Sequence, residues 1–206
     1  MLLTSAGVKN ASIRDALTVL LGKPIAECNA LIVPTAVHAM PNGPAAAWRT
    51  VSGNSGTPLA ELGWKSGGVL ELTALPSIAR EHWVAAVHDA DALLVAGGDP
   101  LYLSYWMTQS GLAEILPTLD DTVYVGVSAG SMVMAPRIGA DFVVWKPPAG
   151  RDETLGFVDF SIFPHLDHPA LPENTMVDAE RWAADLAAPC YAIDDDTAIQ
   201  VTDAGI

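Results

Sequence analysis

Two short apolar segments constrain the fold more than any other part of the sequence. Asp91–Ala96 is almost unbroken in its apolar character, and Val123–Val127 is a second segment of this kind. Each runs directly into a turn that contains glycine. A strand without polar alternation is typical of a parallel sheet covered on both faces, because neither face then points to water. The two segments therefore predict a sheet buried between layers of helices.

Strand-like and helix-like segments alternate along the rest of the chain. Strands are expected at 1–4, 30–33, 67–74, 91–96, 123–127, 158–163 and 198–201, and helices at 13–21, 45–51, 76–88, 101–107, 112–119, from about 130, and 176–186. This alternation is typical of a doubly wound α/β fold. We predict a mostly parallel sheet flanked by helices, in a single domain over residues 1–206.

The composition excludes several classes of function. A formal net charge of −14, with only ten basic residues, repels the phosphates of nucleic acid. No apolar run approaches the roughly 18–20 residues of a membrane span. Met1–Ser5 lacks the basic start of a secretory signal, and Cys28 and Cys190 are expected as reduced core residues. We expect a cytoplasmic protein without nucleic-acid or membrane partners.

The segment Gly126–Gly130 matches the G-x-S-x-G pattern of a nucleophile elbow. In such an elbow the glycines allow a sharp turn that leaves the hydroxyl of the central residue, here Ser128, exposed. The same pattern also occurs in strand–turn–helix connections that have no catalytic role. Its surroundings must therefore decide between the two interpretations.

Polar or glycine-rich segments follow four of the expected strands. They are Gly97–Asp99, Ser128, His165 and Asp194–Asp196. Ligands of open α/β sheets bind beyond the carboxyl ends of the strands, so these segments are expected to converge. A serine needs a base to take its proton, and the base needs an acid to orient it. The chain order serine, histidine, acid differs from that of the α/β-hydrolases.

Among the five histidines, His165 is the favoured base because it comes directly after an apolar strand and its proline. His168 is expected in solvent, three residues further on. His38 is expected in a loop, and His82 and His88 at packed or surface positions of a helix.

Two backbone N–H groups are candidates for an oxyanion hole. Ala129 follows the candidate nucleophile directly, and Gly98 lies in the neighbouring glycine turn. Such donors point at the negative charge that develops in the transition state, and losing one costs about 3–4 kcal/mol.

The chain resembles peptidase family S51, the family of dipeptidase E (the aspartyl dipeptidases) and cyanophycinase, whose fold is related to the class I glutamine amidotransferases. The matching pieces occur in the family's order: Leu2–Ser5, Val95–Asp99, Gly126–Ser131, Phe163–His165 and Ile193–Val201. The combination of this elbow with a later Pro-His is the most specific of them. The resemblance implies a serine nucleophile at Ser128, a base at His165, and oxyanion donors at Gly98 and Ala129.

The resemblance places the family's late glutamate at Asp195. The side chains of Asp194 and Asp196 would point to the opposite side of an extended segment, so a shift of one residue changes this assignment. Asp141 and Asp167 are further alternatives.

Two positions bear on the substrate. Asp99 stands where family members usually carry asparagine, and Arg181 lies about one helical turn beyond the arginine that pairs with aspartate in Asp-X-selective members. Asp178 stands nearer that position. A buried substrate carboxylate without a positive partner is strongly disfavoured, which argues against strict Asp-X specificity. Asp99 and Arg181 are the candidate substrate-binding residues.

We expect a serine-type peptidase that hydrolyses dipeptides or short peptides through an acyl-enzyme on Ser128, without a metal or organic cofactor. One alternative is a hydrolase of another acyl substrate, such as an isopeptide or an ester. Another is a non-catalytic, amidotransferase-like binding module that keeps the elbow as scaffold. The amidotransferase reaction is less favoured because those enzymes carry cysteine where Ser128 stands. An apolar surface strip would support a homodimer.

Overall fold

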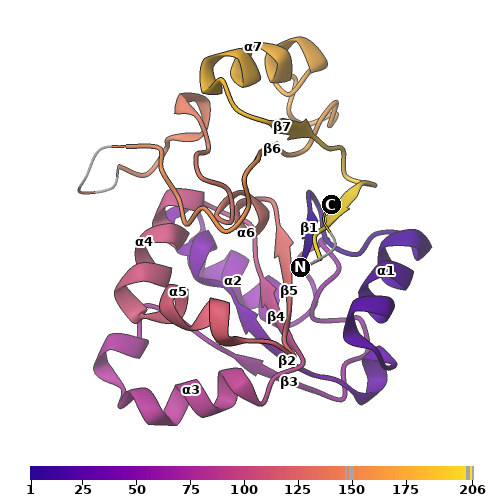
Figure 1. The fold of residues 1–206 in the computed structure, drawn as a ribbon, viewed down its shortest axis with the longest axis vertical. Coiled ribbons are helices and arrows are strands. Elements are labelled where there is room, and N and C mark those ends of the chain that lie inside the picture. The colour runs from indigo at the N-terminus through magenta and orange to yellow at the C-terminus, as the bar shows by residue number, and fades with distance from the viewer. Residues whose placement is uncertain (147, 149–150, 203–204, 206) are drawn as a thin grey trace.

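A six-stranded sheet forms the centre of the protein. The computed structural model describes residues 1–146, 148, 151–202 and 205 (Figure 1). In spatial order the strands are β3 (Ser66–Val69), β2 (Asn29–Val33), β4 (Ala92–Val95), β5 (Val123–Val127), β1 (Leu2–Thr4) and β8 (Ala198–Gln200). Neighbouring strands are parallel except at the β1–β8 pair, which is antiparallel. The predicted mostly parallel sheet is confirmed.

Helices alternate with the strands along the chain, and the first of them begins and ends at recognisable signals. They are α1 (Ala11–Leu21), α2 (Gly43–Val51), α3 (Arg80–His88), α4 (Pro100–Ser110), α5 (Leu112–Ile115), α6 (Ala129–Met132) and α7 (Met176–Leu186). At the start of α1, the side chain of Asn10 accepts the N–H of Ile13. At its end, Gly22 adopts the left-handed conformation and its N–H bonds to Thr18 and Val19 carbonyls. These are the expected helix caps.

Strand β4 shows why the central segments are apolar throughout. Leu93 and Val95 face one core cluster, which contains side chains of α3, α4 and α5. Ala92 and Leu94 face a second cluster, on the side of α1 (Figure 1). Because successive strand residues point to opposite faces, a strand between two helical layers buries every side chain.

Two further strands form a small sheet of their own. Strands β6 (Ser161–Phe163) and β7 (Cys190–Ala192) pair in parallel, apart from the six-stranded sheet. Helix α7 packs on this small sheet through Trp182, whose indole N–H donates to the carbonyl of Ile138 at 2.7 Å. The sequence pattern alone placed the strand at 158–163 in the main sheet, and that placement is wrong.

Several expected elements are shorter than their apolar patterns. Strand β3 ends at Val69, and beyond it the N–H of Leu72 donates to the hydroxyl of Thr35. Helix α3 begins only at Arg80, after an extended residue, Ala79. Strand β6 begins only at Ser161.

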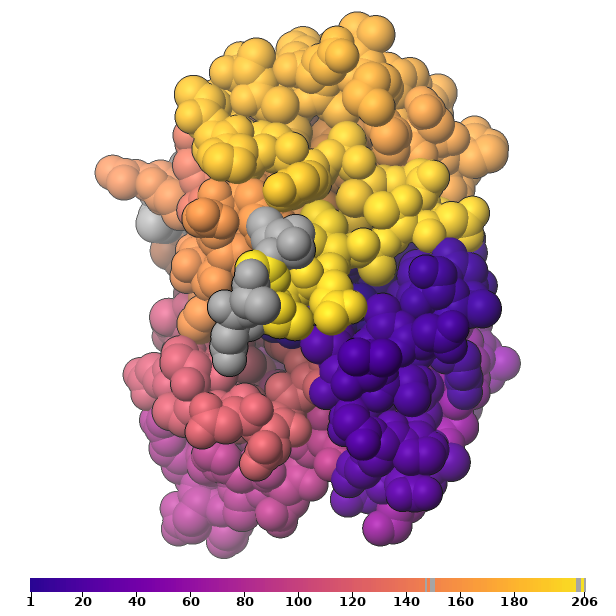
Figure 2. Space-filling model, turned by 45° about the vertical axis from the view of Figure 1, so that its right-hand side comes forward, coloured from indigo at the N-terminus to yellow at the C-terminus, as the bar shows by residue number. Residues whose placement is uncertain are grey.

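Strand β8 brings the two ends of the chain together. It pairs with β1 so that Ala198 lies opposite Thr4, and the first and last segments adjoin on the surface in Figure 2. Because the pair is antiparallel, residues that precede β8 lie at the same edge as residues that follow β1. Within the described part of the chain, no helix has the length and apolar character needed to cross a membrane.

Candidate active site

The elbow places Ser128 in a strained turn between β5 and α6. Ser128 has φ 50° and ψ −111°, a conformation that residues other than glycine rarely adopt. Such a residue costs about 1–3 kcal/mol and persists only where its surroundings hold it. Here the N–H of Ser128 donates to the carbonyl of Thr4 at 2.9 Å, which ties the turn to β1.

The two glycines of the elbow are required by close backbone contacts. A Cβ on Gly126 would lie 2.5 Å from the carbonyl oxygen of Gly130. A Cβ on Gly130 would lie 2.3 Å from the carbonyl oxygen of Val95, on the neighbouring strand. The G-x-S-x-G spacing therefore has a steric cause in this fold.

A buried serine after the nucleophile reinforces the turn. The hydroxyl of Ser131 donates to the carbonyl of Thr4 at 2.8 Å and accepts the N–H of Thr4 at 2.9 Å. The hydroxyl of Thr4 in turn donates to the carbonyl of Gly126 at 2.8 Å. The elbow is thus joined to β1 by side chains as well as by the sheet.

The glycine turn after β4 lies directly beside the nucleophile. A Cβ on Gly97 would be 3.3 Å from the Cβ of Ser128. Gly98 has φ 136°, and a Cβ there would lie 2.4 Å from the carbonyl group of Ala36. Within the described residues, the N–H groups of Gly98 and Ala129 have no hydrogen-bond acceptor. They remain the candidate donors to an oxyanion.

The carboxylate of Asp99 is hydrogen-bonded to backbone N–H groups. It is buried, and its Oδ1 accepts the N–H groups of Leu101 and Tyr102 at the start of α4. Its Oδ2 accepts the N–H of Trp145 at 2.8 Å. Asp99 lines the candidate cavity, yet its carboxylate is occupied by backbone donors that join α4 to the 140–146 segment.

The candidate base and the candidate acid meet beyond the ends of the small sheet. Nδ1 of His165 lies 2.7 Å from Oδ1 of Asp195, and a carboxylate can only accept, so a neutral ring donates from Nδ1. Phe163 pairs with Ala192 across β6 and β7, so the residues just beyond these strands are brought together. This geometry leaves Nε2 of His165 as the nitrogen that can take a proton.

The backbone at His165 is held in the left-handed region, with φ 58°. Its N–H donates to the hydroxyl of Ser5 at 3.0 Å, and that hydroxyl donates to the carbonyl of Ile193 at 2.9 Å. The amide of Asn174 donates to the carbonyl of Pro164 at 3.0 Å. The position of the base therefore depends on two buried polar side chains.

Asp195 is held in its ionised form. Burial raises its pKa, but the hydrogen bond and charge of His165, with the charges of Lys9 and His168, together hold the pKa below its ordinary value. Its side chain is 18% exposed. An ionised carboxylate at this place can orient a histidine and stabilise its protonated ring.

The structure places Asp195 against the candidate base, His165, and leaves the four alternative aspartates elsewhere. Asp194 accepts the N–H of Asp196 and the hydroxyl of Thr197 within its own turn. Asp141 lies 4.0 Å from Arg181, across the cavity wall. Within the described residues, none of Asp194, Asp196, Asp141 and Asp167 is paired with a histidine ring.

Several of the candidate residues line one cavity of about 540 Å³. Ser128, His165 and Gly98 contribute to its wall, as do Asp99 and Arg181. No described residue is hydrogen-bonded to the hydroxyl of Ser128, so the serine–histidine contact is not made in this structure. Catalytic hydrogen bonds of this type often tighten only when substrate binds.

Arg181 is already paired with acidic side chains. Its guanidinium lies 2.9 Å from Asp178 and 4.0 Å from Asp141, and its side chain is 61% exposed. Hydrogen bonds from Thr175, together with Arg181, hold the pKa of Asp178 below its ordinary value. The one basic side chain in the described wall of the cavity, apart from His165, is therefore neutralised by its neighbours.

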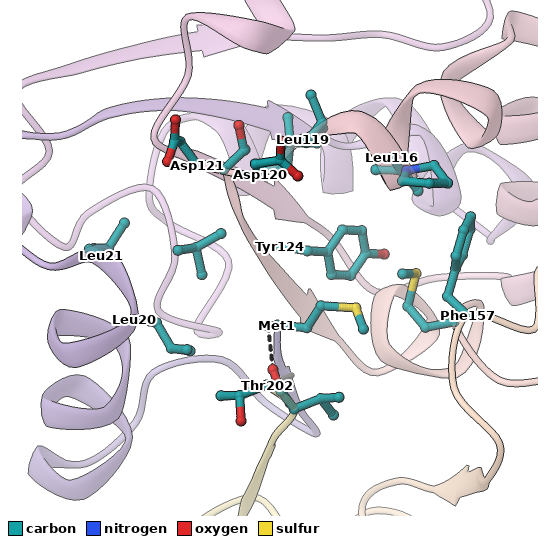
Figure 3. A pocket seen from close by; sticks show the side chains of 16 residues that line it. Met1, Leu20, Leu21, Leu116, Leu119, Asp120, Asp121, Tyr124, Phe157 and Thr202 are labelled. Carbon is teal, nitrogen blue, oxygen red and sulfur yellow. Dashed lines mark hydrogen bonds between the residues drawn. The ribbon is translucent and has the colours of Figure 1, made fainter. Parts of the chain in front are cut away.

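Within the part of the chain that the structure describes, neither a metal site nor a second cavity adds to this candidate site. No three described histidine, cysteine or acidic residues are grouped so that they could hold a metal ion. A second cavity, of about 560 Å³, lies around Met1, Tyr124 and Phe157 and contains none of the candidate residues (Figure 3).

The residues that support the base were not predicted from the sequence. Ser5 belonged to the opening segment of the resemblance, but its contact with His165 follows from neither composition nor periodicity. No motif or pattern in the sequence pointed to Asn174 or Lys9. His168, expected in solvent, is 36% exposed and its Nε2 lies 3.6 Å from Asp195.

Two curated relatives match part of the chain. A peptidase E of Streptomyces coelicolor is 37% identical over 90 residues, which is 42% of this chain and 36% of the relative. An uncharacterized peptidase of Pasteurella multocida is 30% identical over 119 residues, 54% of this chain and 56% of the relative. The matches thus span about a third to a half of these relatives' lengths.

Two solved structures share the fold. A structure described as a peptidase E protein from Listeria monocytogenes superposes with a TM-score of 0.66 at 17% identity, covering 96% of this chain and 91% of that one. A peptidase from an acI-B1 actinobacterium gives a TM-score of 0.67 at 20% identity, covering 96% and 80%. The model of peptidase family S51 matches residues 1–206. The chain therefore belongs to peptidase family S51.

Proposed function

We propose that the protein is a serine-type peptidase that hydrolyses dipeptides or short peptides. One observation carries this proposal: the strained Ser128, the glycine turn at Gly98 and His165 border the same cavity, and His165 is paired with Asp195. Membership of a peptidase family and the similarity to peptidase E support it.

The chemistry follows from the positions of these groups. Nε2 of His165 accepts the proton of the Ser128 hydroxyl as its oxygen attacks the scissile carbonyl, while Asp195 stabilises the protonated ring. The N–H groups of Gly98 and Ala129 donate to the oxyanion. His165 then gives the proton to the leaving amine, and the acyl group stays on Ser128.

The second half of the reaction restores the enzyme. Water enters the cavity, His165 takes one of its protons, and the resulting hydroxide attacks the acyl carbon. The carbon–oxygen bond to Ser128 breaks, and the serine oxygen takes back the proton from His165. No metal or organic cofactor takes part in this route.

The cavity favours substrates without a negative side chain at the acyl position. Arg181 is paired with Asp178, and Asp141 and Glu173 add further carboxylates to the wall. A substrate aspartate would meet a neutralised arginine and like charges, which disfavour it. We also propose, from the composition alone, that the protein is cytoplasmic and forms a homodimer.

Labelling with a fluorophosphonate probe tests the nucleophile. The folded wild-type protein is expected to carry one adduct on Ser128, and Ser128→Ala and heat-denatured protein none. Absence of the adduct from folded wild-type protein would overturn the serine hydrolase proposal. Labelling without cleavage of any peptide would move the function to another acyl substrate.

A dipeptide panel tests the substrate. We expect Ala-X and Leu-X dipeptides to be cleaved with a kcat/KM at least equal to that of Asp-X dipeptides. A clear preference for amino-terminal aspartate would contradict the proposed role of the Arg181 pairing.

A further inference from the structure

The carboxylate of Asp195 has two oxygens with different surroundings. Oδ1 contacts Nδ1 of His165 at 2.7 Å. Oδ2 lies 3.6 Å from Nζ of Lys9 and 3.6 Å from Nε2 of His168. We refer to Lys9 and His168 as the outer clamp. The proposed reaction uses Ser128, His165 and Asp195 and gives the outer clamp no role.

The orientation of His168 is set by its own loop. Its Nδ1 accepts the N–H of Ala170 at 3.1 Å, so a neutral ring carries its proton on Nε2, the nitrogen that faces Asp195. Its backbone N–H donates to the carbonyl of His165 at 3.2 Å. The ring centroids of the two histidines are 6.0 Å apart. His168 is therefore positioned by the same loop that carries the base.

Lys9 reaches Asp195 from the opposite end of the chain. It lies in the loop that follows β1, where the amino-terminal and carboxyl-terminal segments adjoin on the surface (Figure 2). Its neighbour Asn10 donates from its side-chain amide to the carbonyl of Asp196 at 2.8 Å. The loop after β1 thus contacts the turn of Asp195 at two points.

The outer clamp is exposed to solvent on one side. A hollow of about 360 Å³ contains Lys9, His168 and the carboxylate of Asp195. The other ionisable groups that face this hollow are Asp167, Asp194 and Asp196. Of these carboxylates, Asp195 is the one within 4.0 Å of either cation among the described residues.

We infer that Lys9 and His168 are positioning residues of the proposed peptidase, which orient the carboxylate of Asp195 toward His165 and offset part of its negative charge. This inference rests on the proposed function. Lys9 contributes a constant positive charge, and His168 adds one when it is protonated. Both charges oppose the field of Asp195 at the ring of His165, because they are positive and lie close to the same carboxylate.

The direction of the effect follows from charge alone. The base must be neutral to accept the serine proton, so kcat/KM falls on the acid side as its ring becomes protonated. Removing a neighbouring positive charge makes the protonated ring more favourable. The pH of half-maximal kcat/KM on the acid side should therefore rise. At the dielectric constant of bulk water, a charge about 6 Å away, as the ring of His168 is from that of His165, gives a rise of roughly half a pH unit.

The test compares pH profiles of Lys9→Met and His168→Gln with the wild type, using a dipeptide that the wild type cleaves. Matched controls are Lys65→Met and His88→Gln, which change exposed residues elsewhere. The acid limb is the part of the profile in which kcat/KM falls as the pH decreases. We expect it to move to higher pH by roughly half a unit in Lys9→Met and by less in His168→Gln. Lys9→Arg should restore the wild-type limb, and 1 M NaCl should reduce the shift, because salt screens exposed charges.

The possible outcomes separate this inference from the proposed function. If wild-type protein takes no fluorophosphonate adduct, the peptidase proposal fails first. If it is labelled and cleaves peptide, but neither variant moves the acid limb, the outer clamp has no role in positioning and the inference is overturned. A lower plateau with an unmoved limb would overturn it equally, because loss of structure alone lowers activity at every pH.

Discussion

The proposed nucleophile and the proposed base belong to two parts of the molecule that are held together differently. Ser128 lies at the end of β5, inside a six-stranded sheet with helices on both faces. His165 lies beyond the two-stranded β6–β7 sheet and is tethered by Ser5 and Asn174. In the first part, the elbow glycines pack so closely against backbone atoms that a Cβ would not fit. In the second part, a few side-chain hydrogen bonds hold His165 in place.

This difference suggests where changes will act. In the elbow, Gly126 and Gly130 contact backbone atoms that cannot move without disturbing the sheet. A change there should reduce the stability of the whole protein. Around His165, side-chain hydrogen bonds set the position of one ring. A change there should reduce activity more than stability.

Asp195→Asn should have the largest effect on activity. An amide cannot stabilise the protonated ring as a carboxylate does, so kcat/KM should fall by about 10³- to 10⁴-fold with the fold intact. Steady-state kinetics and circular dichroism would measure this. Asp185→Asn, an exposed aspartate of α7, is the control. Near-wild-type activity of Asp195→Asn would move the acid role to another residue.

Gly130→Ala should have the largest effect on stability. Its Cβ would lie 2.3 Å from the carbonyl oxygen of Val95, so the free energy of unfolding should drop by about 3 kcal/mol or more. Urea unfolding would measure the loss. Gly67→Ala is the matched control, because no atom lies within 4 Å of its added Cβ. Equal stability of the two variants would contradict the steric account of the elbow.

Ser5→Ala and Ser131→Ala compare the two parts directly. Each removes a buried hydroxyl that bonds to two backbone groups, so each should cost about 1–3 kcal/mol of stability. Only Ser5→Ala frees the backbone of the base, and its kcat should fall about tenfold, equivalent to about 1.4 kcal/mol. Ser131→Ala should keep kcat within about threefold of wild type, because the sheet still holds the elbow. A larger loss of kcat in Ser131→Ala than in Ser5→Ala would contradict this comparison.

The pH dependence of stability should show the smallest effect. The folded pKa of Asp195 is depressed, so its contribution to stability is present above the unfolded pKa of about 3.9 and is lost as pH falls through the folded value. Urea unfolding between pH 6 and pH 3 should therefore show a shallower acid loss for Asp195→Asn than for wild type. Identical slopes would argue that the carboxylate gains nothing on folding.

Much of the main sheet was predictable because its cause is local. A strand such as Ala92–Val95, apolar at every position, has to be covered on both faces, and its following glycines mark a turn. The elbow was equally visible, since its pattern reflects contacts between residues close in sequence and the adjacent strand. The same local rules overestimated the strand at 67–74, where the hydroxyl of Thr35 captures a backbone N–H from a distant segment.

Which aspartate lies against His165 depended on tertiary structure. From the sequence, a shift of one residue among Asp194–Asp196 would exchange the candidates, and only the pairing of β6 with β7 sets Asp195 against His165. The contact of Lys9 with the same carboxylate depends on the antiparallel β1–β8 pair. The sequence by itself determined the layered sheet, the elbow serine and the favoured histidine, because these arise from local polarity and sterics. Only the tertiary structure decided which acid and which supporting residues meet them, because those contacts join segments more than a hundred residues apart or depend on strand register.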